Sequence, residues 1–155
     1  MRKQAAKKLP LAPDPRFQDK LVTRFVNNIM EQGKKSIAYK IFYDAVDRVS
    51  AQTNENGYDI WKKALSNVTP AVEVRSRRIG GATFQIPAEV RADRKVSLSI
   101  KWLVRYASER NGKSMAEKLA NEIIAASKGE GAAYKKKEDT HRMAEANKAF
   151  SHFKI

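Results

Sequence analysis

The segment from Val72 to Val90 reads VEVRSRRIGGATFQIPAEV. Two runs of alternating side chains flank Gly80 and Gly81, the pair that best tolerates the positive φ angles of a two-residue hairpin turn. This pattern predicts a protruding β-hairpin with its turn at the two glycines. The register that follows pairs three arginines with residues on the second strand: Arg75 with Ile86, Arg77 with Phe84 and Arg78 with Thr83.

Two features of the predicted hairpin bear on its surroundings. Three guanidinium groups on one strand repel each other unless an anion lies between them. Pro87 cannot donate a hydrogen bond to a ladder, so its strand is expected at an edge or in a lone two-stranded ribbon. Because such a ribbon is marginally stable in water, we hypothesise that a helical body and bound nucleic acid stiffen it.

The composition indicates one folded domain without disulfides. The chain has 155 residues, of which 42% are apolar, and its 5 prolines and 7 glycines are too few for a disordered sequence. The absence of cysteine excludes disulfides, thiolate nucleophiles and the common structural zinc sites. No apolar run approaches the roughly 20 residues of a membrane span. The first residues lack the apolar segment of a secretory signal, so we expect a cytoplasmic protein.

The positive charge is unevenly distributed. Lysine and arginine total 31 against 17 aspartates and glutamates, a net charge of +14 that a polyanion would relieve. Residues 1–35 carry nine basic and three acidic side chains, residues 36–70 carry four of each, and residues 71–96 carry six basic and three acidic. The first segment and the hairpin are therefore the predicted contact surface, and nucleic acid is the predicted partner.

Two basic segments precede the hairpin. Residues 1–13 are interpreted as a basic N-terminal arm in front of a single domain at 14–155, with Pro10 and Pro13 discouraging a helix. A frayed terminus is an equally good interpretation of the arm. Lys34 and Lys35 lie before a predicted helix N-terminus, where they suit phosphate or form a solvated turn. The cations of the arm are Arg2, Lys3, Lys7 and Lys8.

Apolar residues at helical spacing predict three helices before the hairpin. The first stripe begins at residue 21 and ends at Gly33, and Asp14 either caps that helix or forms the turn before it. The second helix follows Ser36, the predicted N-cap. The third contains Trp61, which is a predicted core residue.

Three further helices are predicted after the hairpin. A stripe over residues 100–107 leaves Trp102 off its centre, as a partly buried rim residue or a base-stacking platform. Ser114 and Glu117 form a capping box for the next helix, and a thinly apolar helix runs from about residue 132 to Phe150. The predicted fold is mainly α: a single domain of about six helices with one protruding basic β-hairpin at about 72–90 and a basic N-terminal arm. The hairpin root holds Arg91, Arg94 and Lys95.

The residues form no recognisable catalytic or metal-binding constellation. Both histidines, His141 and His152, are expected about three turns apart on one helix, too far apart to share a metal ion. Glu73 and Glu89 fall on opposite faces of the predicted hairpin, so neighbouring arginines are their expected partners. The sequence also lacks a glycine-rich phosphate loop. It predicts binding without turnover, with no cofactor, no metal and no small-molecule substrate.

Four stretches resemble a known family. They are the hairpin segment, Asp14-Pro-Arg-Phe, Gly33-Lys-Lys-Ser, and the C-terminal run that begins Lys136-Lys-Glu-Asp-Thr-His-Arg-Met. From about residue 13 onward, the chain resembles the ribosomal protein S seven family of the bacterial small subunit. The resemblance implies a structural constituent of the small subunit, a primary binder of small-subunit (16S-type) ribosomal RNA that nucleates assembly of the subunit head.

The resemblance also implies roles for individual residues, although the arm is similar to the family only in being basic. The hairpin tip would lie at the subunit interface near the exit-site tRNA, and the C-terminal helix near the mRNA exit path. Ribosomal proteins S nine and S eleven are the implied protein neighbours. The implied rRNA-binding set is Arg2, Lys3, Lys7, Lys8, Lys34, Lys35, Arg75, Arg77, Arg78, Arg91, Arg94 and Lys95. The implied tRNA- and mRNA-proximal set is Arg77, Arg78, Gly80, Gly81, Lys135, Lys136 and Arg142.

Two other classes of function are compatible with parts of this pattern. An architectural protein could use the same basic ribbon on DNA, because positive charge and a β-hairpin do not by themselves distinguish DNA from RNA. An RNA-modifying enzyme would need a cofactor loop and an acid–base pair, both of which the sequence lacks. In either nucleic-acid complex, affinity would fall steeply with salt as bound counterions are released. A protruding hairpin suits RNA junctions, loops and single strands better than the deep major groove of A-form RNA.

Overall fold

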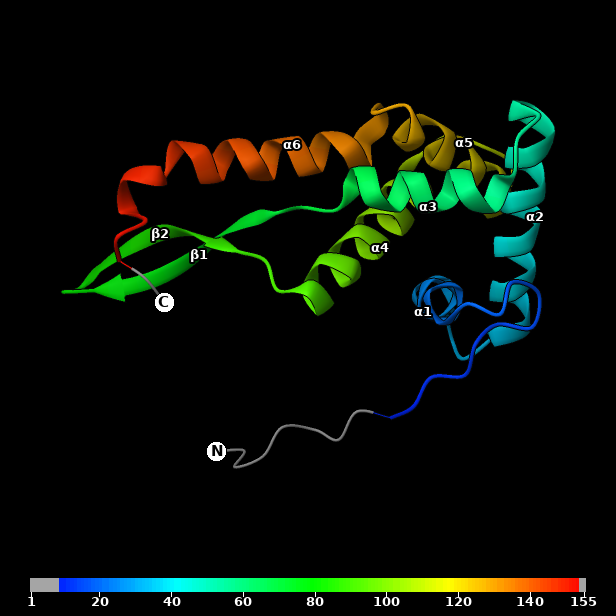
Figure 1. Ribbon diagram of the computed structural model, residues 1–155, viewed down its shortest axis with the longest axis horizontal. Helices are drawn as coiled ribbons and strands as arrows, with labels where there is room; N and C mark the ends of the chain where they lie inside the picture. The colour runs from blue at the N-terminus through cyan, green and yellow to red at the C-terminus, as the bar shows by residue number, and fades with distance from the viewer. Residues whose placement is uncertain (1–8, 154–155) are drawn as a thin grey trace.

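The computed structural model describes residues 9–153, which form six α-helices, one two-stranded antiparallel sheet and a short 3₁₀ helix (Figure 1). This confirms the predicted mainly α class. Residues 1–8 and 154–155 are not described, so the arm cations Arg2, Lys3, Lys7 and Lys8 lie outside the described residues. The elements are α1 (Lys20–Ile29), α2 (Lys35–Thr53), α3 (Gly57–Val68), β1 (Val72–Ile79), β2 (Ala82–Glu89), α4 (Ala92–Glu109), α5 (Met115–Ser127), α6 (Gly131–Ala146) and η1 (Lys148–Phe150).

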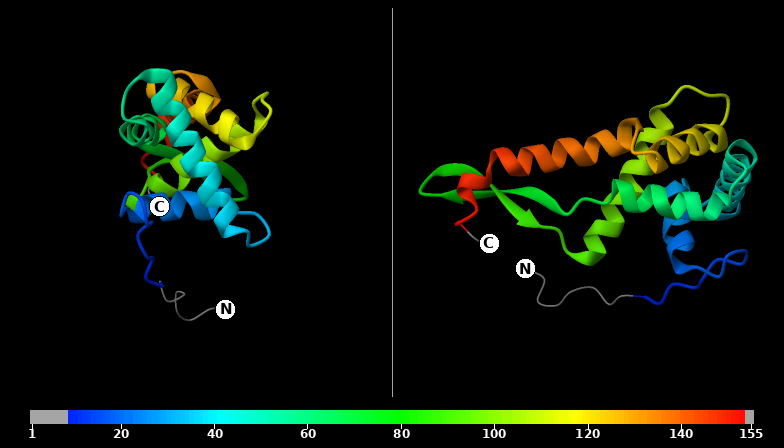
Figure 2. Two further views of the ribbon diagram at one scale, coloured as in Figure 1. Left: turned by 90° about the vertical axis from the view of Figure 1, so that its right-hand side faces the viewer. Right: turned by 45° about the horizontal axis from the view of Figure 1, so that its top comes forward.

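The elements form two parts, which we call the body and the extension. Helices α1 to α5 make the body, and β1, β2, α6 and η1 make an extension that projects from one side of it (Figure 1). The right-hand view of Figure 2 shows α6 running beside the hairpin for much of its length, and α6 contacts both strands. The hairpin is therefore backed by a helix, as the hypothesis of a helical support required.

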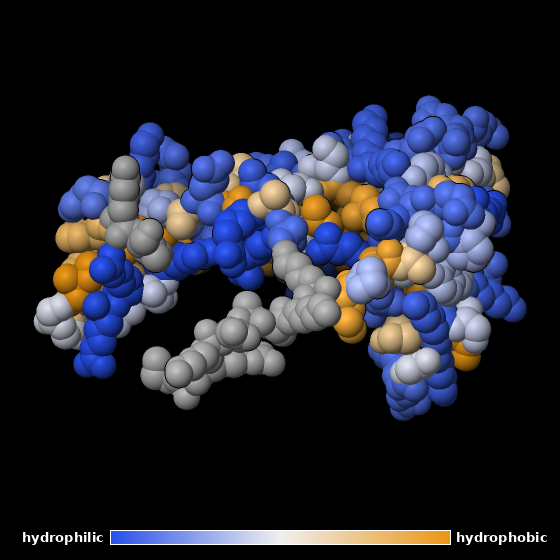
Figure 3. All heavy atoms as spheres, turned by 60° about the horizontal axis from the view of Figure 1, so that its bottom comes forward, coloured by the Kyte–Doolittle hydropathy of each residue, from blue (hydrophilic) through white to orange (hydrophobic). Residues whose placement is uncertain are grey.

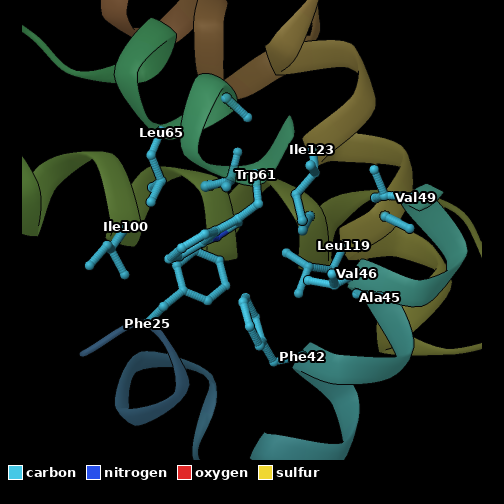
Figure 4. Packing of buried hydrophobic residues seen from close by; sticks show 14 of the residues in the cluster. Phe25, Phe42, Ala45, Val46, Val49, Trp61, Leu65, Ile100, Leu119 and Ile123 are labelled. Atoms are coloured by element: carbon cyan, nitrogen blue, oxygen red, sulfur yellow. The ribbon is translucent and has the colours of Figure 1, made fainter. Parts of the chain in front are cut away.

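The body is organised around three aromatic side chains (Figure 4). Phe25 of α1, Phe42 of α2 and Trp61 of α3 are fully buried. Their ring centroids lie 5.5 Å (Phe25–Phe42), 5.4 Å (Phe25–Trp61) and 5.2 Å (Phe42–Trp61) apart. The two pairs with Trp61 have the edge-to-face arrangement that aromatic quadrupoles favour, and the Phe25–Phe42 pair is tilted. Leu119 and Ile123 of α5 pack beside them. The prediction that Trp61 belongs to the core is confirmed.

Asp14 forms the turn before α1, and Asp19 caps the helix. The buried carboxylate of Asp14 accepts hydrogen bonds from the backbone N–H groups of Arg16, Phe17 and Asp19 at 3.1, 2.9 and 2.9 Å. The hydroxyl of Tyr43 also donates to Asp14, and burial together with this hydrogen bond raises the pKa of Tyr43 to about 12. Asp19 then accepts from a backbone N–H in the first turn of α1 at 2.8 Å. Of the two roles left open for Asp14, the structure selects the turn.

Two predicted helix boundaries between α1 and α2 are wrong. Helix α1 ends at Ile29 and not at Gly33, and the N-cap of α2 is Lys34 and not Ser36. Gly33 takes a φ of +75°, and its carbonyl accepts from the N–H of Lys35 at 2.8 Å. The carbonyl of Lys34 then accepts the first intrahelical hydrogen bond of α2, at 3.2 Å. Because this tight turn starts the helix early, Ser36 lies inside the first turn and cannot cap it.

The hairpin has the predicted register. Arg75 is the Cα partner of Ile86, Arg77 of Phe84 and Arg78 of Thr83. Gly80 and Gly81 take φ values of +57° and +87°, the pair of positive angles that a type I′ turn requires. No third strand joins these two within residues 9–153, which confirms the lone ribbon that Pro87 indicated.

The C-terminal segment differs from the predicted single helix. Helix α6 ends at Ala146, and after Asn147 the chain forms η1 and folds back against β2. The side-chain amide of Asn147 donates to the carbonyl of Met143 at 2.8 Å, a local bond that competes with helix continuation. His152 consequently lies beyond the helix, and its expected place on one helix with His141 is wrong.

Candidate nucleic-acid interface

The cations of β1 divide between the two faces of the hairpin. Side chains alternate along a strand, so Arg75 and Arg77 share one face and Arg78 lies on the other. Arg77 and Arg78 are exposed, as are Gly80 and Gly81 at the turn. The tip therefore presents positive charge on both faces, next to backbone that has no side chain to block the approach of a ligand.

At the hairpin root, Glu73 ties β1 to α4. Its buried carboxylate accepts hydrogen bonds from Nε of Arg94 at 2.8 and 2.9 Å, and from two nitrogens of Arg75 at 3.1 Å. Arg94, more than Arg75, lowers the pKa of Glu73, against the opposing effect of burial. This confirms arginines as the partners of Glu73. The Arg94 and Arg75 side chains remain 48% and 37% exposed, so each combines a structural ion pair with surface open to a ligand.

A shallow depression lies at the N-terminus of α4. A terminal guanidinium nitrogen of Arg24, on α1, lies 3.5 Å from Oγ of Ser97, on α4. The sequence did not single out Arg24, which therefore adds a third cation to the predicted Arg91 and Arg94 at this depression. The depression is lined by Arg91, Asp93, Arg94 and Ser97.

Further cations that the sequence reasoning missed follow the same face of α4. Lys101 and Arg105 are exposed and lie seven and eleven residues after Arg94, the spacing of one helix face. Arg105 forms an ion pair with Glu109 at 3.0 Å. That spacing was visible in the sequence, but only the contact between α1 and α4 shows that Arg24 lies beside this row. The predicted Lys95 is half-buried.

The remaining predicted cations of the body lie at the start of α2. Lys34 and Lys35 are exposed, and Nζ of Lys35 lies 6.0 Å from the centroid of the Tyr39 ring. In Figure 1 the start of α2 lies beside α1, on the other side of an open region from the hairpin. The space-filling view in Figure 3 shows the surface hollowed between the extension and this end of the body. The hairpin, the start of α4 and the α1–α2 link therefore border one concave side.

Helix α6 presents a separate set of cations. It buries only Ala133 and Ala144, the narrow docking face that its polar sequence predicted. Arg142 contacts Asp139 at 4.0 Å, and Glu138 pairs with the neighbouring Lys137. The predicted residues on this helix are Lys135 and Arg142, which are exposed, and Lys136, which is half-buried.

The histidines and the second tryptophan have structural contacts. Nε2 of His141 accepts a hydrogen bond from the backbone N–H of Ala71 at 3.0 Å, and the His152 ring lies 4.1 Å from that of Phe153. Trp102 is half-buried against the body core, as a rim residue would be. Within the described residues, no three histidine or carboxylate side chains are arranged to hold a metal ion, and no helix is long and apolar enough to cross a bilayer.

The fold and the surface charge define a small, basic, mainly α protein of the binding class, with cations of the hairpin, α4 and the start of α2 around a concave side and a separate set on α6. The chain belongs to the family described as Ribosomal protein S7p/S5e, whose model matches residues 1–148. It is 65% identical to the small ribosomal subunit protein uS7 of Flavobacterium psychrophilum and 64% identical to that of Cytophaga hutchinsonii, over all of both chains in each case. It is 55% identical to the corresponding protein of Bacteroides fragilis, again over both full lengths.

The family comparison decides between the classes of function considered above. Proteins of this family are structural, non-enzymatic components of the ribosome. The match over nearly the whole chain confirms the family resemblance of the four sequence stretches. The alternative of a β-arm architectural DNA-binding protein is not supported.

Proposed function

We propose that this chain, a structural component of the small ribosomal subunit, binds the ribosomal RNA of that subunit through the concave basic side. The observation that carries this proposal is the convergence of three separate sets of cations on that side. They are the hairpin set, the α4 set with Arg24, and the pair at the start of α2. The proposed RNA-facing residues also include the arm cations, which lie outside the described residues.

The chemistry of the proposed interface is phosphate neutralisation. Each lysine or arginine that meets a phosphate releases condensed counterions, so affinity should depend steeply on salt. The planar guanidinium group of arginine can also donate two parallel hydrogen bonds to the oxygens of one phosphate. The Glu73 ion pair holds Arg94 and Arg75 in place before RNA arrives, which reduces the ordering that binding would otherwise require. A concave side lined from two parts of the molecule would hold RNA segments together, in keeping with a primary binder that nucleates the subunit head.

The finer placement within the ribosome is also proposed. The tip, with Arg77, Arg78 and the two turn glycines, is proposed to lie near the exit-site tRNA. Its exposed, side-chain-free turn supports close approach to another backbone. The cations of α6 are proposed to lie near the mRNA exit path. Ribosomal proteins S nine and S eleven are the proposed protein neighbours.

A binding titration tests the proposal against its DNA alternative. The full chain would be titrated with the small-subunit RNA junction and with duplex DNA of equal phosphate count, at the same moderate salt. Tighter binding of the RNA junction is the expected result, because shape and 2′-hydroxyl groups add to the charge term that both polymers share. Equal affinity for the two would refute RNA-specific binding.

The double variant Arg77→Ala/Arg78→Ala tests the part played by the hairpin. We expect RNA affinity to fall roughly tenfold or more and the salt slope to shrink by about 1 for each lost phosphate contact. The melting temperature should change by less than about 2 °C, since both side chains are exposed. The matched control is Lys63→Ala/Lys128→Ala, which removes equal charge from a depression at the end of α2 near Gln52 and Thr53. An equal loss of affinity in that control would mean that net charge, and not location, governs binding.

A further inference from the structure

The hairpin needs support at its tip that the root anchors do not provide. Its root is held by Glu73 and by the bond from Ala71 to His141, and Ile86 is buried. Beyond Ile86, most tip residues of both strands are exposed. Two strands alone are marginally stable in water, so an unsupported tip would fray and sample many orientations.

An aromatic cluster supplies a contact near the tip. The Phe84 ring, on β2, lies 5.5 Å from the Phe150 ring and 5.5 Å from the Phe153 ring, measured between centroids. Phe150 and Phe153 are themselves 6.5 Å apart. All three rings are half-buried, although this region lies away from the core cluster of the body. The cluster therefore joins one residue of the hairpin to two residues that follow α6, 66 and 69 positions later in the chain.

The C-terminal turns explain how two phenylalanines reach the same partner. Backbone N–H groups of Phe150, Ser151 and Phe153 each donate to the carbonyl three residues earlier, at 3.0, 3.1 and 3.1 Å. In such 3₁₀ turns, side chains three residues apart lie on one side. Helix α6, whose Ala144 is buried and whose His141 is bonded to the hairpin root, gives this segment a fixed starting point.

The position of Phe84 connects the cluster to the charge at the tip. Phe84 and Arg77 are direct cross-strand partners, so their side chains leave the same face of the ribbon side by side. Whatever fixes Phe84 also fixes the backbone from which the Arg77 side chain emerges.

We propose that residues 147–153 form a clasp that holds the hairpin tip through Phe84 and so orients Arg77 for RNA. This inference rests on the proposed function. Phe84, Phe150 and Phe153 are positioning residues, which act on RNA affinity through the backbone of β1. Because the clasp already restricts the tip, binding costs less conformational entropy, and RNA affinity is higher as a result.

The test compares Phe150→Ala with Phe150→Leu and with Ser151→Ala, an exposed position in the same segment. Hydrogen exchange would be measured at amides of residues 76–85 and, as a control for folding, at amides of α2 and α5. Phe150→Ala should speed exchange at the tip about tenfold and leave α2 and α5 unchanged. Ser151→Ala should leave both unchanged, and Phe150→Leu should recover part of the tip protection. Unchanged tip exchange, or a loss of protection across the body, would overturn the clasp.

A double-mutant cycle in RNA binding separates the clasp from a simple structural role. Phe150→Ala should weaken affinity for the RNA junction about threefold to tenfold, whereas it should have little further effect once Arg77 is already alanine. Full additivity of the two changes would overturn the proposal. If Arg77→Ala/Arg78→Ala weakens binding and Phe150→Ala does not, only the clasp fails. If neither variant changes affinity, the proposed role of the hairpin in RNA binding is wrong, and the proposed effect of the clasp on affinity is wrong with it.

Discussion

The body and the extension are stabilised by different interactions. The body buries one continuous set of aromatic and aliphatic side chains drawn from α1 to α5, which Ala133 at the start of α6 joins. The extension buries few apolar side chains of its own, chiefly Ile86 and Ala144, and relies on Glu73, His141 and the Phe84 cluster. Since hydrophobic stabilisation grows with buried apolar area, the body carries most of the stability. The extension should open locally at a lower free energy than global unfolding.

The two parts meet at a buried carboxylate. Glu122 of α5 is fully buried, forms an ion pair with Arg110 at the end of α4, and accepts the N–H of Ala133 in the first turn of α6 at 2.9 Å. Gly131 has a φ of +89°, and a Cβ there would lie 3.1 Å from Oε1 of Glu122, so the start of α6 needs a glycine. Glu122 therefore ties the start of α6, and with it the extension, to α4 and α5.

The largest expected effect comes from the body core. Trp61→Ala should lower the free energy of unfolding by about 3–5 kcal/mol, because it leaves a cavity between Phe25 and Phe42. Urea titration followed by circular dichroism would measure it. The control Trp61→Phe should lose much less, since the indole N–H has no hydrogen-bond acceptor among the described residues. A hairpin that stays protected while the body unfolds would contradict the dependence of the extension on the body.

A change at the joint should have the next largest effect. Glu122→Ala leaves Arg110 without its partner and the N–H of Ala133 without an acceptor, and should cost about 2–3 kcal/mol. Glu122→Gln keeps an acceptor for that N–H and should cost less. Hydrogen exchange would show faster opening of α6 than of α2 in the alanine variant. Uniform loss of protection in both helices would show that the two parts are a single cooperative unit.

Acid should loosen the hairpin root through Glu73. The pKa of Glu73 in the folded protein is lowered from its usual 4.5, first by Arg94. Because the pKa of Glu73 is lower in the folded state, the stability that its ion pairs give the hairpin root is complete above about pH 4.5. That stability is lost as the pH falls through the folded-state pKa. Glu73→Gln should cost about 1.5 kcal/mol of local stability at pH 7 and abolish this part of the acid dependence. The measurement is hairpin amide exchange against pH, corrected for intrinsic rates. Parallel acid profiles in the wild type and the variant would exclude Glu73 as the titrating group.

The smallest expected effect lies at the tip. Gly81 takes a φ of +87°, where an added Cβ meets no atom within 4 Å, so Gly81→Ala introduces backbone strain without a clash. The strain should cost about 1 kcal/mol and appear only as faster exchange near the turn. The melting temperature should stay within about 2 °C of the wild type. A larger drop would mean that the tip contributes to global stability.

Features encoded by neighbouring residues were predictable from the sequence. The hairpin register follows from Gly80 and Gly81 because a two-residue turn at these glycines, both with positive φ angles, fixes which residues of the two strands face each other. The cap at Ser114 followed from spacing alone, and its Oγ accepts from the N–H of Glu117 at 3.3 Å. The wrong N-cap at Ser36 shows the limit of such local rules. Serine is the better capping residue, but the turn at Gly33 places the N-cap of α2 two residues earlier, at Lys34.

Contacts between distant segments were not predictable. Nothing near Phe84 indicates that Phe150 returns to it, because that contact depends on how α6 packs along the hairpin and on the anchoring of the start of α6 by Glu122. The meeting of Arg24 with Ser97 depends likewise on how α1 crosses α4. Local backbone preference and alternating side chains set the elements and the location of the charge. The packing of helices that lie far apart in the chain set the direction of the extension and the shape of the concave side, because those depend on buried contacts that no short stretch of sequence contains.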